Sequence, residues 1–489
     1  MLNYRLRTKQ INFFMKYFIA AFLLFFSPSL HAQDNASPDF LVKPYLQLGK
    51  KPSPRSMQLL WHAPVSNDLW QAEYKNSDEA DWKTSDNQTF STIAVTGTAP
   101  FNVYSTAFNS LKPGSVFQYR VSRNGKVVFT SEAKSLKSAD QAYQVAISGD
   151  MGAGTSWSKK IAFEIYKVKP DMVAIAGDIV YSQGLISEYK PKFWPVYNKD
   201  IADTLGAPLM RSILFVAGVG NHDALTRDLN RFPDALAYYH FWDQPLNGPN
   251  GKEGGAFVPA LLGSDANKKA FYDGSGDKYP RMTNFSFDYG NAHWTVIDSN
   301  PYVDWSDSTL RDWLAKDLAA AANATWRFVL YHHPCFNSSR AHYEQQQMRV
   351  IAPILENGKV DIVFAGHVHN YQRTYPLTFK PDNWGNQLVA GANNTRTGKT
   401  VNGRWTLDKK FNGKKNTRPN GVIYIVTGAG GQGLYNPEQT KDKDSWQKFT
   451  TRFESTVHSF TILDVNGNTL TLRQVDINGK EVDRMKITK

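Results

Sequence analysis

Short runs that read as strands follow one another through residues 38–138 of the chain. Turn-forming stretches rich in Pro, Gly, Ser and Lys separate them. Short strands punctuated in this way are typical of an all-β sandwich. We therefore expect a sandwich domain over residues 38–138, with strands that include residues 57–61, 92–95 and 116–121.

The pattern changes after residue 142. Fully apolar runs of four or five residues now alternate with stretches of helical period, such as residues 161–168. Strands without polar positions are buried on both faces, so this pattern predicts a layered α/β domain over residues 142–489. The predicted strands cover residues 144–148, 172–176, 212–216, 294–297, 328–331 and 361–365.

Strands return near the C-terminus, at residues 422–426, 459–465, 469–475 and 484–487. Asn-Gly turns join three of them as hairpins, and we expect them to complete the same sheets. Residues 245–283 and 378–418 interrupt the domain. They are rich in Gly, Asn, Asp and Lys, which predicts long surface loops.

The first 32 residues have the order of a secretory signal peptide. Lys16 precedes the apolar run 17–26 (YFIAAFLLFF), and the small residue Ala32 follows at a suitable cleavage position. The run is short for a bilayer span, although an uncleaved anchor is the alternative. We therefore expect a secreted or periplasmic protein without a stable membrane anchor after cleavage. The single cysteine, Cys335, excludes an intramolecular disulfide.

The chain is basic, with a formal net charge of +12. Four cations without any acid lie in residues 1–32, so residues 33–489 carry +8. A net positive charge on residues 33–489 favours an anionic substrate, and it is equally consistent with a well-solvated surface. No long Lys/Arg run or Arg/aromatic stripe indicates a nucleic-acid partner.

Five segments share one design: an apolar strand stops at a turn that carries metal-ligand side chains. Carboxylate, phenolate, amide and imidazole groups bind hard or borderline metal ions, and such strand ends are where α/β sheets bind ligands. A single Gly-Asp turn is weak support, but five blocks in order are difficult to explain by chance. The blocks are Gly149-Asp150-Met151-Gly152, Gly177-Asp178-Ile179-Val180-Tyr181, Gly220-Asn221-His222-Asp223, Val329-Leu330-Tyr331-His332 and Gly366-His367-Val368-His369.

These blocks resemble the metallophosphoesterase signature, and Tyr181 narrows the resemblance to the purple acid phosphatases. The resemblance covers most of the chain after the leader. It implies a four-layer α/β/β/α sandwich for the catalytic domain. Leu111-Lys112-Pro113-Gly114 ahead of Phe117-Gln118-Tyr119-Arg120 looks like a fibronectin type III strand with its corner, which fits the front domain of the family's plant-type members.

The resemblance also implies a role for each ligand position. Asp150, Tyr181 and His369 would hold Fe(III), and Asp178 would bridge both metals. Asn221, His332 and His367 would hold a divalent Fe, Zn or Mn ion. A metal-bound hydroxide would attack the phosphorus.

The chemistry of the residues is consistent with these roles. Asp178 has two oxygens with which to bridge. Tyr181 must lose a proton of pKa about 10, which a trivalent ion favours. His367 and His369 are two apart, so on an extended segment they would share one face. His332 is preferred over its neighbour His333, which we interpret as a histidine that lies behind the ligands or on the surface.

Two histidines are candidates for contact with substrate. By resemblance, His222 contacts the phosphate and His342 contacts it or protonates the leaving group. His342 stands beside Ala341, where the family often has a second histidine, so the proton donor is left open. Asp223 is a candidate to orient His222 or to cap a helix.

Three functions remain open. The first is a phosphatase for small phosphate monoesters, and the second is a phosphodiesterase or nucleotide pyrophosphatase with the same metals. The third is a binding protein that has lost the chemistry, although all seven ligand positions carry competent side chains. The natural substrate and the oligomeric state do not follow from the sequence.

Overall fold

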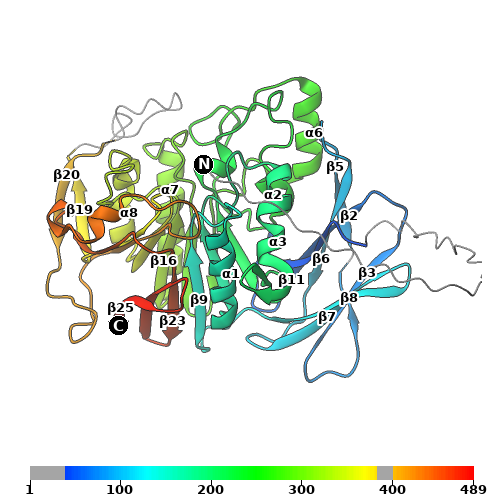
Figure 1. Cartoon of the computed structure of the whole chain (residues 1–489), viewed down its shortest axis with the longest axis horizontal. Coiled ribbons are helices and arrows are strands. Elements are labelled where there is room, and N and C mark those ends of the chain that lie inside the picture. Colours follow the sequence, from blue (N-terminus) through cyan, green and yellow to red (C-terminus); the bar gives the residue numbers. More distant parts are fainter. Residues whose placement is uncertain (1–38, 87, 383–399) are drawn as a thin grey trace, which may run out of the picture. The chain divides into compact units, whose positions relative to one another are not determined.

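The computed structural model describes residues 39–86, 88–382 and 400–489 (Figure 1). The predicted leader lies outside these residues. No helix in the described ranges is long and apolar enough to span a bilayer.

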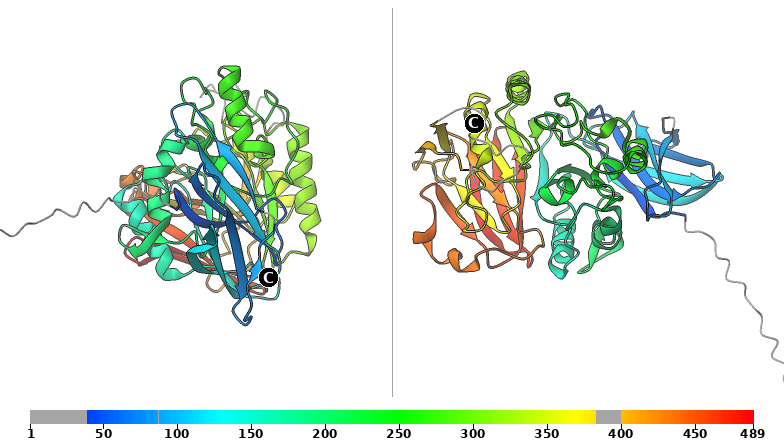
Figure 2. Two further views of the ribbon diagram at one scale, coloured as in Figure 1. Left: turned by 90° about the vertical axis from the view of Figure 1, so that its right-hand side faces the viewer. Right: turned by 90° about the horizontal axis from the view of Figure 1, so that it is seen from above.

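The N-terminal region forms two antiparallel four-stranded sheets, drawn in blue and cyan in Figure 2. Trp61 on one sheet lies 5.9 Å from Trp70 on the other, between ring centroids, so indole rings fill the space between the sheets. The strand-rich region is therefore confirmed, while its fibronectin type III identity stays a prediction. One sheet has the order β1 (Val42–Gln47), β2 (Met57–Pro64), β6 (Phe101–Phe108), β5 (Thr89–Ile93), and the other β4 (Lys83–Thr84), β3 (Trp70–Asn76), β7 (Val116–Arg123), β8 (Lys126–Lys134).

The larger part of the chain contains two mixed sheets. Their central strands run parallel, and β23 pairs antiparallel with β9, so the C-terminal strands complete one of the sheets as expected. The six-stranded sheet has the order β13 (Leu214–Gly218), β10 (Met172–Ala176), β9 (Tyr143–Ser148), β23 (Ser459–Asn466), β24 (Thr469–Asp476), β25 (Glu481–Thr488). The seven-stranded sheet has the order β14 (Phe285–Tyr289), β15 (Ala292–Val296), β16 (Trp326–Tyr331), β17 (Ile362–Ala365), β21 (Ile423–Thr427), β18 (Tyr371–Thr374), β22 (Thr450–Glu454).

The two sheets pack face to face, and helices cover their outer faces (Figure 1). Inward side chains such as Trp294, Phe328 and Phe364 are buried in one core with those of β9 and β10. Aromatic and branched side chains bury much apolar surface here, which stabilises the layered arrangement. The four-layer α/β/β/α expectation is confirmed. The helices on the two sides are α1 (Ser156–Val168), α2 (Ile186–Lys192) and α3 (Trp194–Tyr197), and α7 (Ser308–Ala320) and α8 (Ala352–Asn357).

Helix α1 begins earlier than the hydrophobic period predicted. The Thr155 hydroxyl accepts a hydrogen bond from the backbone N–H of Ser158, which caps the helix at residue 155. The first turn is mostly polar and its Trp157 is exposed, so the apolar pattern alone placed the start at residue 161. The helix ends at Lys169, whose left-handed backbone returns its N–H to two helix carbonyls.

The two predicted surface loops were too simple a description. Residues 245–283 contain α6 (Asp265–Ser275), and Phe257 and Phe271 are buried in the main core. The buried residues here are isolated apolar side chains, so no periodic apolar run in the sequence predicted a packed helix. Residues 378–418 contain an antiparallel ribbon of β19 (Leu377–Pro381) and β20 (Gly403–Leu407) on either side of the residues outside the described ranges. The remaining short elements are β11 (Asn198–Asp203), β12 (Gly206–Pro208), α4 (Asn221–Ala224) and α5 (Tyr238–Phe241).

Candidate metal centre

The five predicted turns meet at the carboxyl ends of the parallel strands, where strands β9, β10, β13, β16 and β17 end. Asp150, Asp178 and His367 adopt positive φ angles of 59°, 51° and 65°. Left-handed backbone is uncommon outside glycine and costs energy, so surrounding contacts must hold it. The turns therefore aim their side chains at one shared volume.

One set of donors consists of Asp150, Tyr181 and His369. The Tyr181 hydroxyl lies 2.7 Å from Asp150 Oδ1 and 3.3 Å from His369 Nε2. His369 Nε2 is also 3.3 Å from Asp150 Oδ1. His369 Nδ1 lies 2.7 Å from the carbonyl of Gly433, which can only accept, so Nδ1 donates this bond and Nε2 faces Asp150 and Tyr181. These three donors can bind one ion.

A second set consists of Asn221 and His332, next to the carboxylate of Asp178. His332 Nε2 lies 3.1 Å from Asn221 Oδ1 and 3.2 Å from Asp178 Oδ1. His332 Nδ1 donates to the carbonyl of Ala176 at 2.8 Å, which turns Nε2 toward Asp178 and Asn221.

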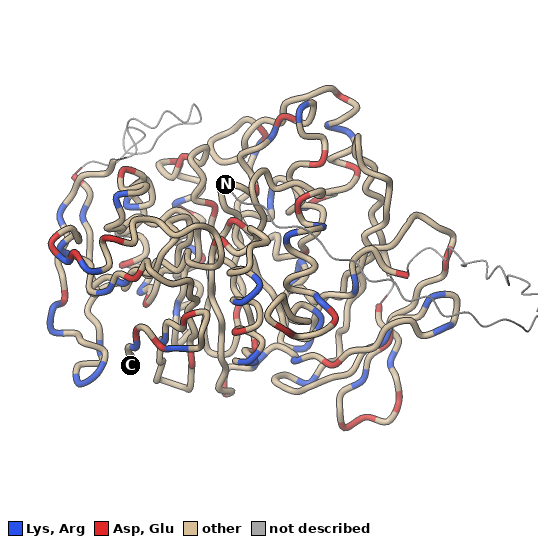
Figure 3. Tube along the Cα trace, viewed as in Figure 1, with Lys and Arg blue, Asp and Glu red and all other residues tan. Residues whose placement is uncertain are grey.

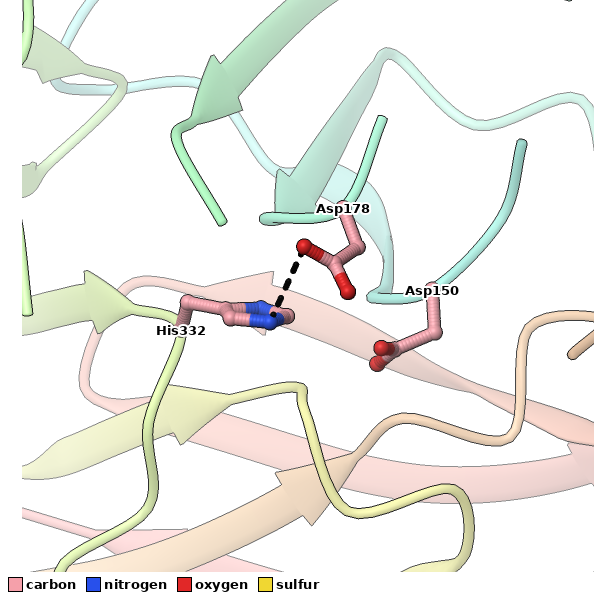
Figure 4. A group of neighbouring side chains, drawn as sticks. All are labelled: Asp150, Asp178 and His332. Carbon is pink, nitrogen blue, oxygen red and sulfur yellow. Dashed lines mark ion pairs between the residues drawn. The ribbon is translucent and has the colours of Figure 1, made fainter. Parts of the chain in front are cut away.

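Asp178 lies between the two sets. Figure 4 shows Asp150, Asp178 and His332 pointing toward one another, with the ion pair of Asp178 and His332 dashed. One ligand atom from each of the three lies within 4.8 Å of the others, and all three side chains are buried. Two buried carboxylates side by side require compensating positive charge, which a metal ion supplies.

His367 joins this group in a different way from the one that its spacing predicted. Its ring lies 5.0 Å from that of His332, and its Nε2 is 2.5 Å from Gln345 Oε1. The expectation that His367 and His369 share one face of an extended segment was wrong. Residues 367–370 form a series of bends, and the left-handed residue 367 turns its ring toward His332.

The pKa values around the centre reflect burial and crowding of like charges. Burial, followed by the charges of Asp150 and Asp178, raises the pKa of Tyr181 well above 10.0. Burial and four neighbouring histidines lower the pKa of His367 well below 6.5. Burial opposes protonation of His332, but the Asp178 carboxylate raises its pKa to about 9. A cation would reverse the effect at Tyr181 and replace the proton on His332.

Asp223 supports the ligand turns rather than His222. Its carboxylate accepts the backbone N–H groups of Gly220 at 2.8 Å, Ile179 at 3.1 Å and Val180 at 3.3 Å. His222 instead places Nδ1 2.7 Å from the carbonyl of Ser182. Of the two roles considered for Asp223, the helix cap is observed, because Gly220 is the N-cap of α4.

The two substrate candidates lie beside the donors. The His222 ring is 4.4 Å from that of Tyr181, and its Nε2 is 3.8 Å from Asp178 Oδ2. The His342 ring is 4.2 Å from that of His367. His333 is buried, not on the surface: its Nδ1 lies 3.0 Å from Ser299 Oγ, and its ring is 4.2 Å from His367.

Gln345 and Tyr435 belong to this neighbourhood but were missed in the sequence. The Tyr435 ring stacks on that of His369 at 4.1 Å and 11°. Neither residue follows a predicted strand, and no local pattern marks them, because only the tertiary fold brings their loops to the centre.

Three further side chains that could bind or react lie in other pairings. Arg373 bonds to Asp483 at 2.6 and 3.1 Å, and Cys335 is buried with its Sγ 3.1 Å from the hydroxyl of Tyr331. His293 bridges Asp288 and Asp317 at 2.8 and 3.1 Å.

Comparison with known proteins places this geometry in a family. The calcineurin-like phosphoesterase model matches residues 143–371, and the model of the iron/zinc purple acid phosphatase-like protein C matches residues 421–484. Purple acid phosphatase 21 of Arabidopsis thaliana is 24% identical over 282 residues, covering 56% of this chain and 54% of the relative. Purple acid phosphatase 1 of Ipomoea batatas is 29% identical over 244 residues, covering 48% and 44%. The chain thus spans about half the length of the curated relatives it matches.

Solved structures agree at the level of the fold. A purple acid phosphatase from yellow lupin (Lupinus luteus) seeds superposes with a TM-score of 0.61 at 16% identity, covering 91% of this chain and 74% of the lupin chain. PhoD superposes with a TM-score of 0.53 at 12% identity, covering 92% and 94%. These structures show the shared fold, while the two family models and the curated relatives show that the chain belongs to the calcineurin-like phosphoesterases and, among them, to the purple acid phosphatases.

Proposed function

We propose that this protein hydrolyses small phosphate monoesters at a dinuclear metal centre. The observation that carries the proposal is the pair of buried donor sets with Asp178 between them. Two adjacent donor sets that share one carboxylate could hold the two neighbouring ions that a two-metal phosphoesterase uses.

The chemistry of the donors favours two different ions. Asp150, Tyr181 and His369 would hold Fe(III). The phenol of Tyr181 has a raised pKa, so it would lose its proton readily only when bound to a strongly charged ion. Asn221, His332 and His367 would hold a divalent Fe, Zn or Mn ion, since a neutral amide and two imidazoles suit a borderline dication. The Gln345 amide at His367 Nε2 would give way to this ion. Asp178 would bridge the two ions.

When bound, two such ions lower the pKa of coordinated water, polarise the phosphoryl oxygens and stabilise an in-line displacement. The residues of the chain supply positioning and protons. His222 is tied through Nδ1 to the carbonyl of Ser182, so its Nε2 donates a hydrogen bond to a phosphate oxygen only when the ring is protonated.

His342 is placed to protonate the leaving oxygen. Its ring lies against His367, at the edge of the second donor set, and it is only half-buried, so it can exchange its proton with solvent. Proton transfer to an alkoxide in the transition state is the usual task of a positioned histidine.

The same proposal includes the leader and the domain division. Residues 1–32 would export the chain to the periplasm or medium, residues 38–138 would form a fibronectin III-like domain, and residues 142–489 the catalytic domain. The substrate would be a small phosphate ester, free rather than held on a nucleic-acid scaffold.

The test compares kcat/KM for an aryl phosphate monoester and the matched diester on one purified enzyme, with and without chelator. Asp178→Asn should abolish chelator-sensitive turnover, while Asp288→Asn, far from the donors, should not. Preference for the monoester supports the proposal. Preference for the diester keeps the metal centre and moves the function to a phosphodiesterase or nucleotide pyrophosphatase. Turnover that survives both the chelator and Asp178→Asn overturns the two-metal mechanism.

A further inference from the structure

A group of cations surrounds the loop that follows β20. We name it the basic loop patch. It consists of Arg404, Lys409, Lys410, Lys414, Lys415, Arg418 and Lys486. All seven side chains are exposed, and none forms an ion pair or side-chain hydrogen bond with the residues that the structure describes. Figure 3 shows blue segments along this loop, at the left of the view.

The basic loop patch holds most of the net charge of residues 33–489. It contains seven cations, and Asp408 is the one acid within its loop, so it supplies six of the eight net charges of residues 33–489. Elsewhere on the chain many surface cations pair with acids, for example Arg484 with Glu481. Six of these cations lie within residues 404–418 of the sequence, and the fold adds Lys486 from a different strand.

The fold holds these charges in place. Asn412 Oδ1 accepts the backbone N–H groups of Lys414 and Lys415, both at 2.9 Å, which shapes the turn that presents them. The carbonyl of Gly413, a residue with φ of 66°, accepts the N–H of Lys486 at 2.8 Å. Phe411 is buried beneath the loop. The backbone of the patch is therefore anchored to β25 and is already ordered before binding.

Part of the patch is concave. Lys410, Lys415 and Arg418 line a cavity of about 500 Å³, together with Asn416 and Asn420. Three cations and two amides around a hollow suit an oxyanion such as a phosphate group. Asp408 also lines it, but its carboxylate accepts three backbone N–H groups of its own loop and so remains fixed.

We propose that the basic loop patch docks the protein on an anionic phospholipid surface. Clustered lysines near a membrane attract acidic headgroups without needing an ordered partner, and each adds to the attraction. A nucleic acid fits less well, because single-stranded binding uses exposed aromatic platforms, whereas Phe411 is buried and Trp405 is half-buried. The proposal does not depend on the proposed function.

The experiment is flotation of the full-length mature protein with vesicles of phosphatidylcholine and phosphatidylglycerol, or of phosphatidylcholine alone. We expect binding only to the anionic vesicles, lost in high salt because of screening. Lys414→Ala/Lys415→Ala should weaken binding by about tenfold or more. The matched control is Lys441→Ala/Lys443→Ala, which removes two exposed lysines that alternate with Asp442 and Asp444.

Equal binding to neutral vesicles, no binding to anionic vesicles at low salt, or an equal loss in the control variant would overturn the proposal. So would tighter binding to duplex DNA or RNA than to anionic vesicles, since the patch would then be a nucleic-acid surface. Both variants should keep the wild-type melting temperature and the wild-type rate on a soluble ester, which separates docking from hydrolysis.

Discussion

The backbone N–H of Ile179 donates to the carboxylate of Asp223, and its nitrogen lies 3.1 Å from each carboxylate oxygen. Through this bond and the bond from Gly220, one buried side chain connects the turn that carries Asp178 with the turn that carries Asn221. Burial and the nearby Asp178 raise the pKa of Asp223 to about 7. The two donor turns thus depend on a residue that belongs to neither donor set.

Replacement of Asp223 by Asn should therefore loosen the metal centre. An amide keeps the shape but offers one acceptor oxygen and turns an N–H group toward backbone N–H groups. We expect metal affinity to fall by roughly ten- to a hundredfold, with hydrolysis falling alongside it. Metal content after dialysis measures the effect. Asp234→Asn is the control, because Asp234 also accepts a backbone N–H, but from Ser187 in α2 rather than from a ligand turn. Wild-type metal retention in Asp223→Asn would contradict the positioning role.

Tyr181 should give the iron-loaded enzyme its colour. A phenolate bound to Fe(III) absorbs visible light, so Tyr181→Phe should remove that absorption and weaken iron binding. Tyr435→Phe is the matched control: Tyr435 stacks on His369 but belongs to neither donor set, and its variant should stay coloured. An unchanged visible spectrum in Tyr181→Phe would refute the assignment.

The effect of His342→Ala should depend on the leaving group of the ester if His342 donates the proton. Esters with poor leaving groups need protonation and should slow by about a hundredfold or more, whereas activated aryl esters should slow much less. The measurement is kcat/KM across a series of leaving-group pKa values. His222→Ala should slow all members similarly, since His222 lies beside the bridging carboxylate of Asp178. Equal slowing of the whole series in His342→Ala would exclude the acid role.

His293 should make stability depend on pH in the alkaline range. Burial opposes its protonation, but hydrogen bonds to Asp288 and Asp317 raise its pKa to about 9 from 6.5. A raised histidine pKa stabilises the fold fully below pH 6.5, and this contribution is lost as the pH rises through about 9. His293→Gln should cost about 3 kcal/mol at a pH just below 6.5 and little above the folded pKa.

Urea unfolding of wild type and His293→Gln across this range measures that difference. His458→Gln serves as the control, because His458 bonds to a backbone carbonyl and its pKa is lowered, chiefly by burial. Parallel stability curves for wild type and His293→Gln would show that the ion pairs contribute nothing.

Sequence alone determined most of the central strands and the residues at their ends, whereas β14, β18 and β22 were not predicted. Strand β10 has the bounds that its apolar run predicted, residues 172–176, and β9, β16 and β17 differ by one or two residues at one end. This information is local, since a buried strand needs an unbroken apolar run and a ligand turn follows directly after it. The seven donor positions could therefore be assigned from neighbouring residues and from resemblance to a family.

The tertiary structure decided how those positions combine. Asp223, Gln345 and Tyr435 make their contacts at the centre through the packing of distant loops, and Lys486 completes the basic loop patch from another strand. The helix within residues 245–283 was hidden for the same reason, because its buried side chains meet partners far away in the chain. Hydrophobic period and turn chemistry are set by neighbouring residues, whereas hydrogen-bond partners and clustered charges are set by which loops the packed sheets bring together.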